Sequence, residues 1–332
     1  MAALKLSIAL SPNPRNWPII DGSVTVDGVD LICNVLHPSE MFWRQLHHEE
    51  FDISEMSFSS LMMARSRGDE RWAGLPVFTT RRFFHTGILV RRDAGIERPA
   101  DLKGKRVGVP EYQQTAALWT RGVLQHEFGV LAQDMEFWME RAPEHSHGGA
   151  TGFKPPPGVT VHTIAPDKSI GSMMLTGELQ AALHYIVNDN LIDRSKADLH
   201  NHPDIKLLFP DRTAEGVRYY TKTGIYPINH GMVVKRSVAD RHPWLIEKLM
   251  DAFDRANAKI DRRRMEHTAY YIETGLLPAD ARQKLREPLV RHGIKANRVT
   301  LETCARYSHE QGLTPRRMKL EEIFEPSTME RV

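Results

Sequence analysis

The stretch RRFFHTGILVRRDAGIERPADLKGKRVGVPEYQQT, residues 81–115, decides the fold. It holds an apolar run at 87–90, a charged exit, a proline-containing linker and a second apolar run at Arg106–Val109. Such runs, bounded by glycine and proline, are typical of buried strands. A similar segment returns downstream, since HTGILVRR at 85–92 resembles NHGMVVKR at 229–236. We therefore predict that the chain leaves one lobe and later returns to it by matching strands.

The rest of the chain alternates strand-like and helix-like segments. Strands are expected at Leu4–Leu10 and Asp52–Met56, each followed by a polar loop or an amphipathic helix. This rhythm predicts an α/β fold. A length of 332 residues is too great for one small core and predicts two lobes. We expect lobe 1 to comprise residues 1–91 and 231–332, lobe 2 to comprise 92–230, and a ligand cleft to lie between them.

Composition and charge exclude several classes of protein. The 44 basic residues nearly balance the 42 acidic ones, so nucleic acid is not an expected partner. No apolar run approaches the ~20 residues that span a bilayer, so no membrane is expected. The amino terminus looks like a strand and not like an export signal, which predicts a cytoplasmic protein. Apolar stripes on the terminal helices make a homo-oligomer possible, although such stripes are more often core.

Two segments and the run DLKGKRVGV at 101–109 carry a resemblance to known proteins. The segments are VGVPEYQQTAALWTRG at 107–122 and YPINHGMVVK at 226–235. The chain resembles the type II periplasmic-binding-protein fold over nearly its whole length and, within it, looks most similar to the 4,5-dihydroxyphthalate decarboxylases. The resemblance implies two mixed sheets flanked by helices and joined by a two-strand hinge.

The same resemblance implies a function. It implies a carboxy-lyase that removes one carboxylate from 4,5-dihydroxyphthalate, or a close aromatic acid, to give protocatechuate and carbon dioxide. The partner would then be a small aromatic carboxylate. Two alternatives stay open: a non-catalytic cytoplasmic protein that binds aromatic acids, and a sibling enzyme on this scaffold that acts on another aromatic or heteroaromatic acid.

The chemistry of such a substrate points to histidine and carboxylate side chains. An acid must protonate the ring carbon that loses its carboxylate, and a base must take the proton of the hydroxyl para to it. His85 and His230 each precede the glycine of one of the two similar segments, so we expect both near the hinge. Glu55 ends a short apolar strand and is a candidate base or a partner that orients a histidine. Each of the three can instead have a purely structural role.

The carboxylate that stays on the ring requires a cationic anchor, best a guanidinium. The substrate-binding candidates share an expected position at the cleft: Arg15, Arg81, Arg82, Tyr112, Gln113, Thr115 and His184. Neighbouring residues of a strand point to opposite faces, so at most one of Arg81 and Arg82 should reach the cleft readily. Thr115 opens a helix, whose amino terminus favours an anion, although it can also be a simple N-cap.

The sequence contains no established metal or cofactor motif. His145 and His147 lie in a loop rich in glycine and proline, without the spacing of HExxH or paired cysteines. GxGxxG and Walker A motifs are absent as well. We therefore expect no cofactor and no metal site. A divalent metal stays open as an alternative, because adjacent ring hydroxyls chelate metals.

Overall fold

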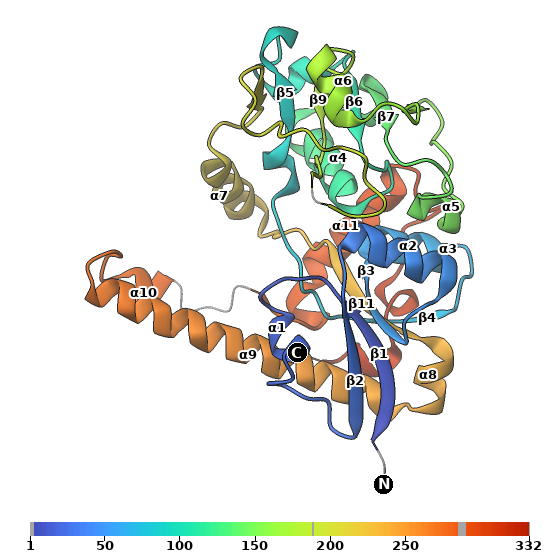
Figure 1. Cartoon of the computed structure of the whole chain (residues 1–332), viewed down its shortest axis with the longest axis vertical. Coiled ribbons are helices and arrows are strands. Elements are labelled where there is room, and N and C mark those ends of the chain that lie inside the picture. Colours follow the sequence, from blue (N-terminus) through green and yellow to red (C-terminus); the bar gives the residue numbers. More distant parts are fainter. Residues whose placement is uncertain (1–2, 188, 285–289, 332) are drawn as a thin grey trace.

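The computed structural model describes residues 3–187, 189–284 and 290–331, which form two lobes stacked along the long axis (Figure 1). The lower lobe is built on a sheet with the strand order β2-β1-β3-β11-β4. Its strands are β1 (Leu4–Leu10), β2 (Val29–Val35), β3 (Ile53–Ser57), β4 (Trp72–Leu75) and β11 (His230–Lys235). The first three run parallel, and β11 is antiparallel to both β3 and β4.

Helices surround this sheet and extend beyond it. They are α1 (Trp17–Ile20), α2 (Pro38–His48), α3 (Phe58–Ser66), α8 (Arg236–Arg241), α9 (Trp244–Glu273), α10 (Ala281–Lys284) and α11 (Arg298–Glu310). The long helix α9 contributes Leu245, Leu249 and Phe253 to the core of the lower lobe. Its far end projects away from the sheet (Figure 1).

The upper lobe has a sheet of its own, with the strand order β10-β5-β9-β6-β7-β8. Its strands are β5 (Leu89–Arg91), β6 (Arg106–Val109), β7 (Glu136–Met139), β8 (Thr160–Thr163), β9 (Ala181–Ala182) and β10 (Ile205–Leu207). Its helices are α4 (Thr115–Phe128), α5 (His147–Thr151), α6 (Ile170–Thr176) and α7 (Arg212–Thr223). β5 is antiparallel to its neighbours while β6, β7 and β8 run parallel, so both sheets are mixed, as predicted.

The two segments that cross between the lobes pair with each other. Arg81 forms an antiparallel bridge with Ile228. The Arg82 amide donates to the Pro227 carbonyl at 3.2 Å, and the Asn229 amide donates to the Thr80 carbonyl at 2.9 Å. The predicted two-strand connection therefore exists, but it lies a few residues before the apolar run that was expected to form it.

The predicted strand at 87–90 requires a correction. Residues Phe84–Gly87 form a 3-10 turn, and the strand that follows, β5, belongs to the sheet of the upper lobe. The predicted end of lobe 1 at residue 91 thus falls after a strand of the second sheet. The similar segment at 230–235 is β11, in the other sheet. Apolar runs of the same pattern predict strands, but they do not say which sheet each strand joins.

A shared core joins the two lobes. Helix α11 follows α9 in the chain, yet its Tyr307 packs edge-on against Trp119 of α4 in the upper lobe, with ring centroids 5.5 Å apart. The Trp119 indole N–H donates to the Ile228 carbonyl at 2.8 Å, so the same tryptophan holds a crossing segment. In Figure 1, α11 lies where the lobes meet. None of the helices formed by the described residues has the length and apolar character needed to cross a membrane.

Candidate functional site

A cavity of about 490 Å³ lies between the lobes. The carboxyl ends of three parallel strands open into it, since Ser11 follows β1, His37 follows β2 and Ser57 ends β3. Open α/β sheets hold their ligands at this edge. The upper lobe closes the other side with residues 184–187 and Gln114, the residue that precedes α4. This cavity is the candidate active site.

A buried carboxylate holds a histidine at the wall of the cavity. Oε2 of Glu55 lies 2.8 Å from Nδ1 of His230. These residues reach each other because β3 and β11 are adjacent antiparallel strands, with Glu55 opposite Met232. Oε1 of Glu55 accepts hydrogen bonds from the Ser11 amide (2.8 Å), the Ser11 hydroxyl (2.7 Å) and the Asn16 amide group (2.5 Å). The carboxylate is thus fully satisfied and fixed in place.

The surroundings of Glu55 keep it ionised. Burial opposes ionisation, but the hydrogen bonds from His230 and Ser11 hold the pKa of the Glu55 carboxyl below its ordinary value. An ionised Glu55 sets the proton of His230 on Nδ1, so that Nε2 is an acceptor, and in this structure Nε2 accepts from the Asn229 side-chain amide at 2.8 Å. Phe42 packs edge-on against the imidazole, with centroids 4.7 Å apart, and helps to fix the ring. The pair therefore forms a preorganised acid–base group.

Two arginines and a second histidine share the cavity. Arg15 lies in the loop after β1, where its Nη1 donates to the Thr79 carbonyl at 3.3 Å, and Arg82 lies on a crossing segment. His184 has the left-handed backbone angle φ = 52°, which is uncommon outside glycine and marks a constrained position. Burial and the nearby Arg82 guanidinium lower the pKa of His184 to about 3. His184 is therefore a neutral hydrogen-bonding group at pH 7.

A buried ionic cluster joins the lobes beside the cavity. Arg141 of the upper lobe donates from Nη1 to Glu111 at 2.6 Å and from Nε to Asp193 at 2.8 Å. Its Nη2 donates to the Ser39 hydroxyl of α2 at 2.5 Å, and that hydroxyl donates to Asp193 at 2.7 Å. The side chains of the three charged residues are at most 1% exposed. Ser39 belongs to the lower lobe, so its hydroxyl ties this cluster of the upper lobe to α2 of the lower lobe.

The structure brings together six of the predicted site residues. His230, Arg15, Arg81, Arg82 and His184 contribute to the lining of the cavity, and Glu55 lies directly behind His230. The sequence analysis missed Gln114, whose buried Oε1 has no hydrogen-bond partner, and His37. The sequence position of each residue could have indicated its place at the cavity, because Gln114 adjoins the predicted helix start and His37 follows a parallel strand, as Arg15 does.

His85 lies outside the cavity. It belongs to the 3-10 turn before β5, and its Nε2 is 3.0 Å from Oε1 of Glu215 on α7. Its ring is buried against Phe209 and Tyr219. The expectation that His85 and His230 meet at one site is wrong, because the turn directs His85 into the packing between α7 and the rest of the upper lobe.

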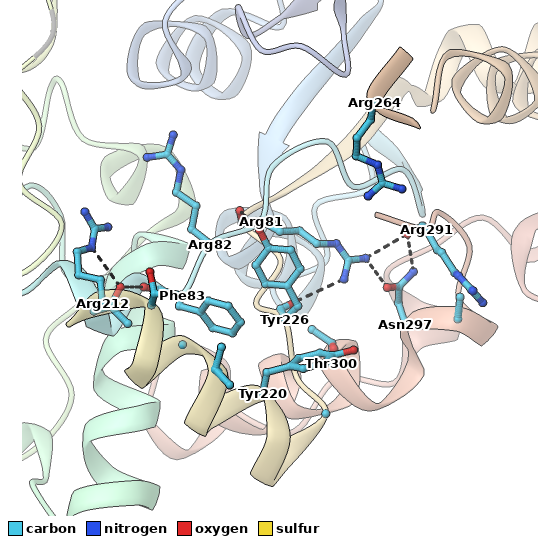
Figure 2. A pocket seen from close by; sticks show the side chains of 16 residues that line it. Arg81, Arg82, Phe83, Arg212, Tyr220, Tyr226, Arg264, Arg291, Asn297 and Thr300 are labelled. Carbon is cyan, nitrogen blue, oxygen red and sulfur yellow. Dashed lines mark hydrogen bonds between the residues drawn. The ribbon is translucent and has the colours of Figure 1, made fainter. Parts of the chain in front are cut away.

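Arg81 points away from the cavity that holds His230. Its guanidinium donates to the Arg291 carbonyl at 3.1 Å and contacts Oδ1 of Asn297, on the other side of the crossing segments (Figure 2). Arg82, the next residue, is exposed. Parts of both residues line the cavity that holds His230, although the Arg81 guanidinium is directed elsewhere.

Three candidates at the start of α4 serve packing and hydrogen bonding. Tyr112 is fully buried, and the guanidinium carbon of Arg121 lies 3.6 Å from its ring centroid. Gln113 bonds to Glu111. Thr115 Oγ1 lies 2.8 Å from the Ser57 hydroxyl and accepts from the Ser59 amide at 2.9 Å, which ties α4 to α3. The neighbouring Gln114 is the residue here that lines the cavity.

Comparisons with known proteins add the family. The chain is 32% identical over 335 residues to a 4,5-dihydroxyphthalate decarboxylase of Comamonas testosteroni, covering 99% of each chain. It is 39% identical over 183 residues to a protein of the same name from Pseudomonas putida, covering 55% of this chain and 71% of that protein. The chain belongs to the 4,5-dihydroxyphthalate decarboxylase family. A family model described as NMT1/THI5 like also matches residues 59–138.

Solved structures confirm the fold. The alkanesulfonate-binding protein SsuA of Xanthomonas axonopodis pv. citri matches with a TM-score of 0.56 and 14% identity, covering 98% of this chain and 99% of that one. The desulfurization enzyme DSZB matches with a TM-score of 0.50 and 15% identity, covering 98% and 97%. At this identity the likeness concerns the fold alone, which is that of the periplasmic binding proteins and is the one predicted.

Across residues 3–187, 189–284 and 290–331 no group of three or more histidine, cysteine or acidic side chains has an arrangement suited to a metal ion. The histidines around the cleft make other contacts. His147, for example, bonds through Nε2 to the Ser39 carbonyl at 3.1 Å.

The ionic cluster generates a prediction about stability. Replacing Arg141 by methionine leaves Glu111 and Asp193 buried without their counter-ion, so we expect a loss of about 3–5 kcal/mol in the free energy of unfolding. Arg298→Met is the control, because Arg298 pairs with Glu302 on an exposed face of α11. This substitution should lower the free energy of unfolding by less than about 1 kcal/mol. Urea denaturation measures both changes. Equal losses in the free energy of unfolding for the two variants would contradict the contribution to stability that we assign to the buried cluster.

The same cluster predicts a dependence on pH. Burial opposes ionisation of Asp193, but Arg141 and the Ser39 hydroxyl prevail and lower its pKa from 3.8 to about 2. The folded state binds this proton less tightly than the unfolded state does. At neutral pH this difference adds about 2 kcal/mol to the free energy of unfolding. That contribution is complete above the unfolded pKa and is lost as pH falls through 2. In urea titrations between pH 6 and 2, Asp193→Asn should lose less stability on acidification than the wild type; identical curves would contradict this assignment.

Proposed function

We propose that this protein decarboxylates 4,5-dihydroxyphthalate, or a closely related aromatic acid, to protocatechuate and carbon dioxide in the cavity between its lobes. The observation that carries the proposal is the Glu55–His230 pair at the cavity wall, with Arg15 and Arg82 in the same cavity. Membership of a family whose named relatives are 4,5-dihydroxyphthalate decarboxylases supports the choice of substrate.

Binding comes first in the proposed reaction. The substrate has two neighbouring carboxylates, one of which stays on the ring. A guanidinium can hold a carboxylate by two parallel hydrogen bonds, which fixes both its position and the plane of the ring. Arg15 and Arg82 are the guanidinium groups that line the cavity besides Arg81, and Arg81 is directed elsewhere. We assign the anchoring of the retained carboxylate to Arg15 and Arg82.

Proton transfer follows. The hydroxyl para to the leaving carboxylate gives up its proton, and the ring carbon that bears this carboxylate gains one. The bond from that carbon to the carboxylate then breaks, carbon dioxide leaves, and the bonding electrons return to the ring and restore aromaticity. We assign protonation of the carbon to Nε2 of His230, because ionised Glu55 balances the charge of an imidazolium at this position.

His184 has a complementary place in this scheme. Its imidazole is neutral at pH 7 because its pKa is lowered to about 3 by burial and by Arg82. A neutral imidazole offers a lone pair and can accept a hydrogen bond from a ring hydroxyl. A group with so low a pKa is too weak a base to take up the phenolic proton, so we assign to His184 the orientation of the ring hydroxyl, whose proton passes to water while His230 delivers one to carbon. Two histidines on opposite lobes would thereby act on opposite ends of the ring.

Activity is tested most simply with the purified protein and 4,5-dihydroxyphthalate. We expect carbon dioxide and protocatechuate to form in equal amounts. Tight binding without turnover would favour a non-catalytic aromatic-acid binding protein, and turnover of a different aromatic acid alone would favour the sibling enzyme. A parallel reaction with EDTA, followed by addition of divalent metal, shows whether a metal takes part.

The anchoring assignment predicts a specific kinetic change. Arg15→Gln removes one cation from the cavity, so we expect KM to rise by about tenfold or more while kcat changes less, since the interaction is made with a carboxylate that does not react. Arg298→Gln on the exposed face of α11 is the matched control and should leave both constants unchanged. A fall in kcat with unaltered KM would place Arg15 in the chemical step.

A further inference from the structure

A second cavity, of about 890 Å³, lies on the other side of the crossing segments. We call it the rear cavity. The upper lobe contributes Arg212 and Tyr220 of α7, and the lower lobe contributes Arg264 of α9 and Thr300 of α11. Figure 2 shows these side chains grouped around the crossing segments. The rear cavity is therefore lined by both lobes, as the catalytic cavity is, but it contains no histidine among its described lining residues.

The lining of the rear cavity is strongly basic. Five arginines contribute to it: Arg81, Arg82, Arg212, Arg264 and Arg291. Within the part of the chain that the structure describes, no aspartate or glutamate lines this cavity. Arg264 pairs with Asp261, which lies outside the lining, at 3.2 Å. The whole chain has a formal net charge of only +2, so five arginines around one cavity still concentrate positive charge. Such a surface attracts an anion.

Arg81 shows that this charge is not balanced within its own contacts. It is 9% exposed, yet its partners are neutral oxygens: the carbonyls of Tyr226 (3.4 Å) and Arg291 (3.1 Å) and the amide oxygen of Asn297. Its Nε is buried with no hydrogen-bond partner. A buried guanidinium without a counter-ion is costly, and an anion in the adjoining cavity would reduce that cost.

The supports around Arg81 are rigid. The Asn297 side chain donates to the Arg291 carbonyl at 3.0 Å and to the Gly293 carbonyl at 2.7 Å, which directs its Oδ1 at Arg81. The Tyr226 hydroxyl donates to the Arg81 carbonyl at 3.1 Å. The cationic end of the cavity is thus held in place before any ligand arrives, which lowers the entropic cost of binding.

Aromatic rings complete the lining. Phe83 and Tyr226 have ring centroids 5.0 Å apart at an angle of 36°, and Tyr220 is 53% exposed although it lines the cavity. Exposed tyrosine rings next to guanidinium groups are suited to a flat ligand that stacks and carries negative charge. The guanidinium groups and the aromatic rings together favour a flat, negatively charged ligand.

We propose that the rear cavity is a second binding site, which takes an aromatic ligand bearing carboxylate or phosphate groups. Arg212 and Arg264 would hold the same ligand from opposite lobes, with Arg81 behind it. The site contains no acid–base pair like that of Glu55 and His230, so it binds and does not react. Its existence does not depend on the decarboxylation proposed above, because it is defined by its own residues.

Equilibrium binding tests this proposal. The probes are benzene-1,2-dicarboxylate, adenosine 5′-monophosphate and inorganic phosphate, each titrated calorimetrically into the whole protein. The test variant is Arg212→Gln/Arg264→Gln. The matched control is Arg262→Gln/Arg263→Gln, which removes the same charge from exposed positions, both on α9. Circular dichroism and the unfolding midpoint without ligand establish that both variants are folded.

We expect at least one aromatic probe to bind about tenfold or more weakly to the test variant, and within twofold of wild type to the control. A probe that also enters the catalytic cavity should change from two bound molecules to one. Binding of the dicarboxylate alone identifies a carboxylate ligand, and binding of the nucleotide alone a phosphate ligand. If every probe binds the test variant as tightly as it binds the control variant, the proposed site is wrong. If inorganic phosphate binds as tightly as the nucleotide, the proposal that the ligand is aromatic is wrong.

Discussion

The buried ion cluster around Arg141 is the contact on which the closed arrangement of the lobes depends. A guanidinium with no exposure to solvent is tolerated only where its hydrogen bonds are satisfied, and here Glu111, Asp193 and Ser39 together satisfy them. Ser39 comes from the lower lobe, so its hydrogen bonds with Arg141 and Asp193 are lost if the lobes separate, whereas the three charged residues, all in the upper lobe, can stay paired with one another. The Ser39 hydroxyl thus links a buried ionic cluster of one lobe to the other lobe.

Closure matters because it brings the chemical groups of two lobes to one place. The lower lobe supplies the Glu55–His230 pair and Arg15 from the ends of its strands, while the upper lobe supplies His184 and Gln114. Neither set alone surrounds a ring. A scaffold with a cavity between two lobes is suited to catalysis when a titratable pair is held at the cavity wall, which is the role that we propose for Glu55 and His230.

The crossing segments divide the molecule into two regions with different chemistry. Their side chains alternate, so that Arg81 faces the rear cavity while His230 faces the catalytic one. The catalytic side combines histidines with a buried carboxylate. The rear side combines arginines with tyrosines and has no described acidic lining.

Sequence reasoning predicted the fold, and it predicted those residues of the candidate site whose position at the cavity follows from local rules. Strand ends in a parallel sheet gave Arg15 and Glu55, and the return segment gave His230. The similarity of the segments at 85–92 and 229–236 misled the placement of His85, because a strand pattern does not specify the partner strand or the turn before it. The sequence could not predict the cluster of Glu111, Arg141 and Asp193, because these residues are far apart in the chain and no local sequence pattern connects them.

The turnover of His230→Gln tests the central claim most directly. Glutamine keeps a polar side chain of similar reach but cannot carry the proton. Release of carbon dioxide from 4,5-dihydroxyphthalate should fall by about 100-fold or more, while the affinity for the substrate stays within a few fold of wild type. Unchanged carbon dioxide release by a folded His230→Gln variant would contradict the assignment of the reaction to the Glu55–His230 pair.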